Sequence, residues 1–257
     1  MNKNAAMNWN ETDRRPSLGR NLTLGMVEAL GRAIVTGSFD GKRFPTEAEL
    51  TVQYGVSRVV TREAVKMLTA KGLLSSRPRQ GTSVEPSTSW NLFDTDILDW
   101  LLQRKFSVDL LRHFTELRLS IEPMAAVFAA RAGSEASLAA IRAGYRRMEL
   151  ADRGEDDALD ADIAFHVAIM RASGNPFFRQ FEGVVSTALR SSIRFTNSLK
   201  GHSASLPEHE AVLNAICRRD EEGARQAMFQ IISDVLALID ASYPVVPAAD
   251  QPAAAEG

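Results

Sequence analysis

Apolar residues recur with helical spacing over three short stretches near the start of the chain. From Leu22 to Ile34 they return at every third or fourth position, which predicts a helix over about 22–37. Two further helical patterns meet at Gly55, and a short strand pair follows them. This order of three helices and a hairpin predicts a winged helix-turn-helix over residues 21–86.

Start and stop signals mark the ends of the two predicted helices that meet at Gly55. Thr46 followed by Glu49 is the pattern of a capping box, in which each side chain binds a backbone N–H of the other residue. Ser57 can cap the second helix. Gly72 can end it, because glycine readily adopts the left-handed conformation that closes many helices.

Beyond the stretch Pro-Ser-Thr-Ser at 86–89, the chain contains only amphipathic helical patterns. We expect helices at residues 94–104, 107–131, 135–152, 156–173, 176–197, 205–219 and 220–242. The predicted fold class is therefore mostly α, with an all-α bundle of about seven helices at 94–243 and a linker at 87–93. The polar segment 1–20 and the Pro- and Ala-rich segment 244–257 are expected to be disordered tails.

Charge is distributed unevenly between the two predicted domains. Residues 1–86 carry 13 Lys and Arg against 8 Asp and Glu, a net charge of +5. Residues 87–257 carry 17 against 24, a net charge of −7, so the overall value of −2 conceals a basic N-terminal part. Because DNA phosphates attract a basic surface, this imbalance favours a nucleic-acid partner for the first domain.

The composition favours a cytoplasmic protein. The single cysteine, Cys217, cannot form an intramolecular disulfide framework, which fits a reducing compartment. The N-terminal segment lacks the apolar core of a signal peptide, and no apolar run approaches the ~18 residues of a membrane span. We therefore expect no membrane partner.

Two arginines lie one turn apart on the predicted helix that follows Gly55. Arg58 and Arg62 share a face, and an arginine fork can bind O6 and N7 of guanine. A cation at the start of a helix opposes the helix dipole, so a phosphate or a base explains Arg58 better than helix stability does. For Arg62, an ion pair on the helix surface stays an alternative.

Three motifs in this region resemble the GntR family of bacterial transcription regulators. They are P-T-E-A-E-L at 45–50, G-V-S-R-V-V-T-R-E-A-V at 55–65 and R-Q-G-T-S-V at 79–84. The helical remainder resembles the effector domain (FCD) of the FadR-type subfamily, and the segment from Trp90 to Trp100 is similar to that of a galactonate-responsive member. The resemblance implies a DNA-binding transcriptional regulator and not an enzyme.

In this family the recognition helix and the wing contact double-stranded operator DNA. The resemblance implies such contacts for Thr46, Ser57, Arg58, Val59, Arg62, Arg77, Arg79, Gln80 and Gly81. Ala48 stands where many members carry an arginine, and Val-Val-Thr at 59–61 replaces a commoner Thr-Thr-Val. The operator is therefore expected to differ from the subfamily average.

Asp162 and His166 are four residues apart, which places them on one face of a predicted helix. Such a pair is most often capped or solvent-facing. The resemblance implies a divalent metal, because the family's effector domain holds one through an Asp and three His, and Asp162, His166 and His209 match three of these positions. Ile231 stands at the fourth. Zn²⁺ is expected, with Ni²⁺ or Mn²⁺ as alternatives, and three ligands leave room for an effector oxygen. Loss of the metal, with the same residues binding the effector directly, stays open.

Arg118, in the stretch E-L-R-L-S-I-E-P, is the first candidate to bind an effector carboxylate, because a guanidinium can hold a carboxylate through two hydrogen bonds. An intrahelical ion pair with Glu122 is the alternative. Arg190, Arg194 and Ser205 are further candidates for the same pocket. The resemblance implies a sugar acid as effector, such as galactonate or a related hexonate or hexuronate.

Together these features predict a ligand-gated repressor. A homodimer would present two recognition helices to a pseudo-palindromic operator, and an anionic effector would release it. An activator or dual regulator that responds to another organic acid is the first alternative. A metal-dependent enzyme fits less well, because no activated nucleophile accompanies the Asp and His residues, and a structural nucleoid protein would not need a helical bundle with interior Asp and His.

Overall fold

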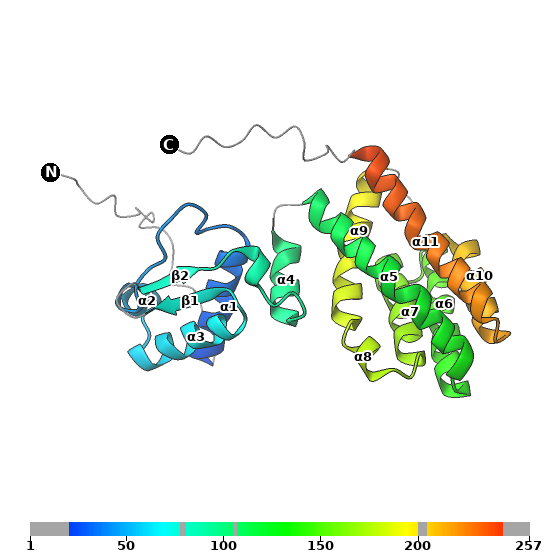
Figure 1. Ribbon diagram of the computed structural model, residues 1–257, viewed down its shortest axis with the longest axis horizontal. Helices are drawn as coiled ribbons and strands as arrows, with labels where there is room; N and C mark the ends of the chain where they lie inside the picture. Colours follow the sequence, from blue (N-terminus) through cyan, green and yellow to red (C-terminus); the bar gives the residue numbers. More distant parts are fainter. Residues whose placement is uncertain (1–20, 78–80, 105–106, 200–204, 244–257) are drawn as a thin grey trace. The chain divides into compact units, whose positions relative to one another are not determined.

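The computed structural model describes residues 21–77, 81–104, 107–199 and 205–243, without the side chains of 193–199. It divides into two compact units, Met1–Lys105 and Phe106–Gly257 (Figure 1). Helices dominate both units, as the hydrophobic pattern predicts. None of the described helices combines the length and the hydrophobicity that crossing a membrane requires.

The first unit is a winged helix-turn-helix, which confirms the predicted fold. Its elements are α1 (Leu22–Val35), α2 (Glu47–Tyr54), α3 (Arg58–Ala70), β1 (Leu74–Arg77), β2 (Gly81–Val84), the short 3-10 helix η1 (Ser87–Ser89) and α4 (Thr95–Gln103). The two strands pair in antiparallel register, with Leu74 opposite Val84 and Arg77 opposite Gly81. The wing therefore follows directly on the recognition helix α3.

Side-chain caps determine where α2 and α3 begin. The capping box is formed: Glu49 N donates to Thr46 Oγ1 at 3.3 Å, and Thr46 N donates to Glu49 Oε2 at 2.7 Å. Ser57 Oγ accepts a hydrogen bond from Val60 N at 3.3 Å. Gly55 makes the left-handed turn between the helices, with a φ of 66°. Local sequence signals thus fix the start of the recognition helix.

Helix α4 belongs to the first unit, which corrects the domain boundary expected at 87–93. Its Trp100 is only 1% exposed, and the indole Nε1 donates to Glu28 Oε2 on α1 at 2.8 Å. A methyl group at Gly31 of α1 would come within 2.2 Å of the indole ring. Periodicity shows that α4 is amphipathic, but it does not show which unit covers the apolar face.

The segment before α4 is also held by the first unit. Lys71 Nζ lies 2.7 Å from carboxylate oxygens of Asp94 and Asp96. The backbone N–H of Asn91 donates to the carbonyl of Lys71 at 3.0 Å. The residues expected to form a linker therefore extend the winged domain.

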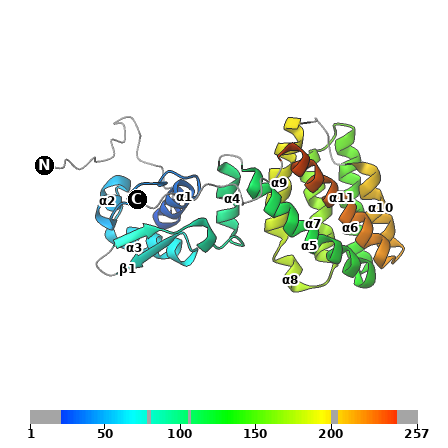
Figure 2. The ribbon, with the colours of Figure 1, turned by 45° about the horizontal axis from the view of Figure 1, so that its top comes forward.

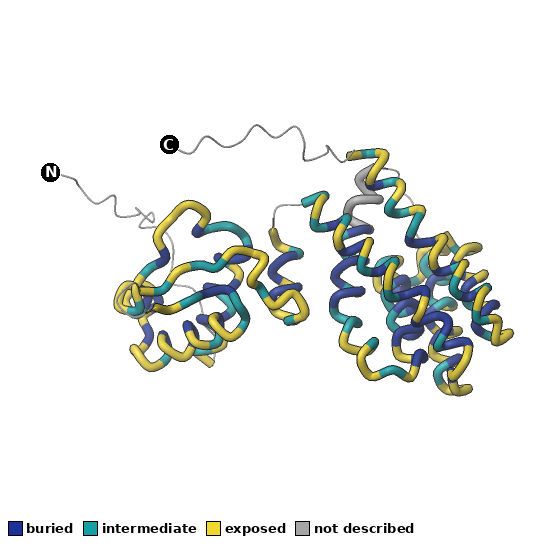
Figure 3. Tube along the Cα trace, viewed as in Figure 1, coloured by how far each residue is buried: buried dark blue, intermediate teal, exposed yellow. Residues whose placement is uncertain are grey.

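The second unit is a helical bundle. Its helices are α5 (Val108–Ala132), α6 (Glu135–Asp152), α7 (Ala158–Ala172), α8 (Pro176–Arg179), α9 (Glu182–Leu199), α10 (Leu206–Cys217) and α11 (Glu221–Ser242). Two views show α11 along α5 and α10 beside α11, and both pairs are in contact (Figure 2). Buried residues recur along α5, α7 and α9, so each of these helices turns one side toward the core (Figure 3).

One expected helix is divided into two. The stretch 176–197 contains α8 and the greater part of α9, separated by a tight turn of i to i+3 backbone hydrogen bonds. The turn brings Phe178 against Phe128, with ring centroids 5.6 Å apart, and packs Phe181 against the core. Because the apolar pattern continues through the turn, periodicity does not reveal the break.

Helices α6 and α7 approach each other closely at Gly144. A Cβ atom there would lie 2.8 Å from the Cα atom of Phe165 on α7. The missing side chain lets α7 lie deep in the bundle, where Asp162 and His166 become buried. Close helix packing thus positions the polar residues that the sequence singled out.

Removal of the indole at Trp100 is expected to destabilise the first unit. Trp100→Ala should cost about 3–5 kcal/mol of unfolding free energy, because a buried ring and its hydrogen bond are lost. Gly31→Ala should also destabilise the unit, because its methyl group would displace the indole. Urea unfolding followed by circular dichroism measures both effects, with Trp100→Phe as the conservative control. Native-like unfolding midpoints in both variants would contradict the placement of α4.

Candidate metal centre and nucleic-acid interface

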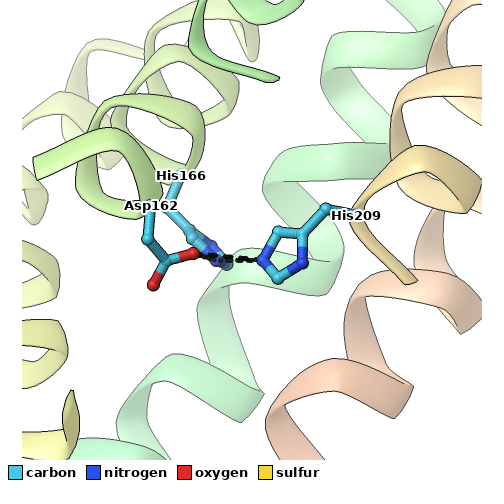
Figure 4. A group of neighbouring side chains, drawn as sticks. All are labelled: Asp162, His166 and His209. Carbon is cyan, nitrogen blue, oxygen red and sulfur yellow. Dashed lines mark hydrogen bonds and ion pairs between the residues drawn. The ribbon is translucent and has the colours of Figure 1, made fainter. Parts of the chain in front are cut away.

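Three polar side chains converge inside the second unit. Asp162 and His166 of α7 and His209 of α10 are 4%, 1% and 2% exposed. His209 Nε2 is 3.1 Å from Asp162 Oδ1 and 3.4 Å from His166 Nε2 (Figure 4). His166 Nε2 is 3.5 Å from the same carboxylate oxygen. The structure therefore brings the three residues together, and their burial excludes a solvent-facing Asp–His pair.

The Nδ1 atom of each imidazole has a hydrogen-bond acceptor of its own. His209 Nδ1 lies 2.7 Å from the carbonyl oxygen of Ser205, which can only accept, so this nitrogen carries the proton. His166 Nδ1 lies 2.5 Å from Glu122 Oε2, and an ionised carboxylate also only accepts. When both rings are neutral, their Nε2 atoms present lone pairs to each other and to Asp162.

A divalent cation fits this arrangement. Asp162 Oδ1 is buried and has no hydrogen-bond partner among the described residues. Two imidazole lone pairs and a carboxylate oxygen that face one another repel unless a cation or a proton lies between them. Ligands held tetrahedrally by Zn²⁺ at about 2.0–2.2 Å lie about 3.3–3.6 Å apart, so the spacing of these three atoms suits such an ion.

The position expected for a fourth ligand offers no donor atom. Ile231 of α11 is 7% exposed and belongs to the apolar core. Within the described ranges, the group of residues able to hold a metal consists of Asp162, His166 and His209. Three protein ligands leave coordination positions for water or for an oxygen of a bound molecule.

Arg118 and Glu122 of α5 adjoin the three residues. Arg118 Nε donates to Glu122 Oε1 at 2.5 Å, and both side chains are buried. The intrahelical pair is therefore formed, but inside the bundle instead of on a helix surface. Burial raises the pKa of the Glu122 carboxyl, yet the charges of Arg118 and His166 outweigh burial and lower it to about 2. Glu122 is ionised and bridges two cationic or hydrogen-bond-donating groups.

The charge of His166 depends on what occupies the centre. Burial lowers its pKa, but the carboxylates of Glu122 and Asp162 outweigh burial and raise the pKa to about 9. Burial also raises the pKa of Asp162, but the two histidines hold it well below its usual range. Without a bound cation, His166 therefore carries a proton between two carboxylates at neutral pH. A metal must displace that proton.

The remaining effector candidates are placed differently. Arg190 Nη2 pairs with Asp160 Oδ1 at 3.0 Å, with the two side chains 41% and 51% exposed, so its charge is engaged at the surface. Ser205 is the N-cap residue of α10, and its carbonyl, not its hydroxyl, orients His209. The side chain of Arg194 lies outside the described residues.

The recognition helix exposes the residues expected to contact DNA. Arg58, Val59 and Arg62 all lie on its solvent-facing side, and Val59 is 72% exposed. Arg62 Nε is 3.8 Å from Glu47 Oε2, a long surface contact of the kind that contributes little stability. An exposed valine between two arginines suits the methyl group of a thymine in the major groove.

The other expected DNA contacts lie at helix starts and on the wing. Thr46 and Ser57 use their hydroxyl groups as helix caps, so they also position the N-terminal ends of α2 and α3. Arg77 and Gly81 are paired at the end of the strands where the wing turns. Arg79 and Gln80 lie outside the described residues.

Comparison with known proteins identifies both units. Residues 22–84 match the family of bacterial regulatory proteins named gntR, and residues 113–234 match the FCD domain. The chain is 32% identical to the HTH-type transcriptional regulator YieP of Escherichia coli K12, over 81% of this chain and 91% of that protein. It is 31% identical to the galactonate operon transcriptional repressor of the same strain, over 88% and 96%. A solved structure of Lar, which controls the agr system of Listeria monocytogenes, shares the fold at 18% identity with a TM-score of 0.53, over 86% of this chain and 97% of that one.

Zn²⁺ binding is expected to strengthen as the pH rises. His166, with its pKa of about 9, is protonated in the metal-free protein at neutral pH, so a bound ion must displace a proton. The apparent Kd should therefore fall about tenfold per unit between about pH 6 and 8. Competition against a chelator of known pH dependence measures it. His166→Ala should bind Zn²⁺ weakly at every pH. A native Kd that is constant over this range would contradict the assignment of His166 as a ligand.

Proposed function

The chain belongs to the GntR family of bacterial regulatory proteins, and we propose that it represses a sugar-acid catabolic operon until a small carboxylate binds beside a divalent metal in its helical unit. As a member of this family it is a DNA-binding transcriptional regulator. The observation that carries the proposal is the buried cluster of Asp162, His166 and His209, with Arg118 and Glu122 beside it. A bundle needs no such cluster for stability, since buried charges replaced by apolar residues often leave a protein equally stable.

The first unit supplies the DNA contact. Arg58 and Arg62 are exposed on α3, and within the described part of the chain Arg62 has one long surface ion pair, with Glu47. In the major groove such arginines bind guanine, while the wing with Arg77 contacts the backbone or the minor groove. We include a homodimer in the proposal, because one recognition helix contacts only a half-site and two-fold pairing doubles the specific contacts.

The second unit supplies the anion site. Asp162, His166 and His209 would hold the metal, which supplies a concentrated positive charge for a carboxylate oxygen. By formal charges, Asp162 and Glu122 contribute −2, Arg118 contributes +1, and a divalent metal would contribute +2. The remaining +1 suits one carboxylate, and a sugar acid carries one carboxylate among hydroxyl groups. The galactonate operon repressor, at 31% identity, supports this class of effector.

Effector binding lowers operator affinity by acting on an equilibrium between two states of the protein. An anion that prefers the state with low DNA affinity shifts the population toward it in proportion to that preference. A coupling of about 1–3 kcal/mol corresponds to a 5- to 150-fold loss of operator affinity. By reciprocity, bound operator weakens anion binding by the same factor.

Sugar acids should stabilise the Zn²⁺-loaded protein against heat. An anion at 100 times its Kd adds about 2.7 kcal/mol to the free energy of unfolding. The panel should contain galactonate, gluconate and galacturonate, with lactate, citrate and neutral galactose for comparison. Arg118→Gln is expected to remove most of the shift. Stabilisation by citrate without stabilisation by any sugar acid would contradict the monoanion assignment.

Arg58→Ala should weaken DNA binding without affecting the anion site. The DNA is a duplex selected from a random library. Loss of a bidentate hydrogen-bonded contact to a base should lower the affinity for this duplex by about 5- to 150-fold. Fluorescence anisotropy measures it, and Arg146→Ala, an exposed arginine on α6, is the matched control. Native affinity in Arg58→Ala would contradict base contact by α3. Loss of both DNA binding and the galactonate-induced thermal shift would indicate misfolding.

A further inference from the structure

One carboxylate connects the two functional halves of the buried site. Glu122 Oε1 accepts from Arg118 Nε, and Glu122 Oε2 accepts from His166 Nδ1, each at 2.5 Å. Glu122 is 1% exposed, so water does not compete for either oxygen. The contact to His166 joins α5 to α7, between residues 44 apart in the chain.

A carboxylate is the only common side-chain group that satisfies both partners. The Nε of arginine and the protonated Nδ1 of the imidazole are both donors, so each needs an acceptor. A glutamine at this position would turn its NH₂ group toward one of the two donors. The other end of Arg118 differs, since Nη1 and Nη2 make no hydrogen bond within the described part of the chain. We expect an anion to bind these atoms.

We propose that Glu122 is a positioning residue that couples anion binding at Arg118 to metal binding at His166. This inference rests on the proposed function and adds how the two halves of the site communicate. Arg118 and His166 share the charge of one carboxylate. An anion that neutralises the guanidinium weakens its hold on Glu122 and leaves more of that charge to His166. The stronger hydrogen bond at Nδ1 makes Nε2 a better metal ligand.

Anion and metal therefore bind cooperatively. Because coupling free energies are reciprocal, whatever factor the anion adds to metal affinity the metal adds to anion affinity. The protein would therefore bind the effector more tightly when its metal is present.

The coupling can be measured with Zn²⁺ alone, in the full-length chain. Glu122→Gln should weaken Zn²⁺ binding about 10- to 100-fold, as loss of a histidine's carboxylate partner does. Glu116→Gln, an exposed glutamate on the same helix, should leave the Kd unchanged. Arg118→Gln imitates a neutralised guanidinium, so it should tighten Zn²⁺ binding about fivefold or more in the native background and by less than about twofold in the Glu122→Gln background.

Co²⁺ substitution supplies a second measurement. Within the described residues, Arg118 pairs with Glu122 and with none of the three metal ligands, so a merely structural role would leave the visible spectrum of bound Co²⁺ unchanged. The spectrum should shift in Arg118→Gln. Glu122→Asp keeps both acceptor oxygens and should retain part of the Zn²⁺ affinity that Glu122→Gln loses, which separates lost charge from lost folding.

Two results would overturn the coupling. One is an equal effect of Arg118→Gln in both backgrounds, or no effect at all, with the Co²⁺ spectrum unchanged. Either would leave the repressor proposal standing, since the native site would still bind metal. The other is a native protein that binds no Zn²⁺, which would remove the coupling and the metal-dependent part of the proposed function together.

Discussion

The burial of two ionised carboxylates in an apolar bundle is the constraint on which the second unit depends. Glu122 and Asp162 are 1% and 4% exposed, and each would destabilise the fold by several kcal/mol if left without a partner. Glu122 has Arg118 and His166 as partners. Among the described residues, Asp162 faces the two imidazoles, whose Nδ1 atoms contact other acceptors. A proton on His166 or a bound metal ion supplies the positive charge that Asp162 needs, and exchange of the proton for the ion makes the cluster a candidate metal site.

Close packing supplies the geometry for this balance. Gly144 lets α7 approach α6, and the carbonyl of Ser205 holds the ring of His209. In the first unit the same principle acts through Trp100, which is accommodated only because Gly31 has no side chain. Two glycines and one backbone carbonyl group thus determine where the functional side chains lie.

The sequence predicts the local features of this protein well. Thr46, Gly55 and Ser57 act through contacts only a few residues apart, so their motifs predict the helix-turn-helix and its caps. The grouping of Asp162, His166 and His209 followed from the family resemblance, because the i, i+4 spacing alone does not separate a buried site from a solvated one.

Most features that the sequence did not predict depend on contacts between distant residues, whereas the break between α8 and α9 is a local turn within a continuous apolar pattern. Trp100 reaches Glu28 across 72 positions, which places α4 in the first unit and not in the bundle. Glu122 was expected only as a partner of Arg118, and its second contact, to His166, depends on how α5 meets α7. Arg190 has the right spacing on α9 but pairs with Asp160 at the surface. Helical periodicity shows which face is apolar, but it does not identify the partner of that face.

The most direct test of the metal centre is X-ray absorption spectroscopy of the purified protein after Zn²⁺ loading and removal of excess metal. We predict one ion per chain, bound by two imidazole nitrogens and by oxygens, and the imidazole scattering should halve in His209→Ala. A spectrum without imidazole scattering, or one that is identical in the variant, would show that the buried cluster holds no metal.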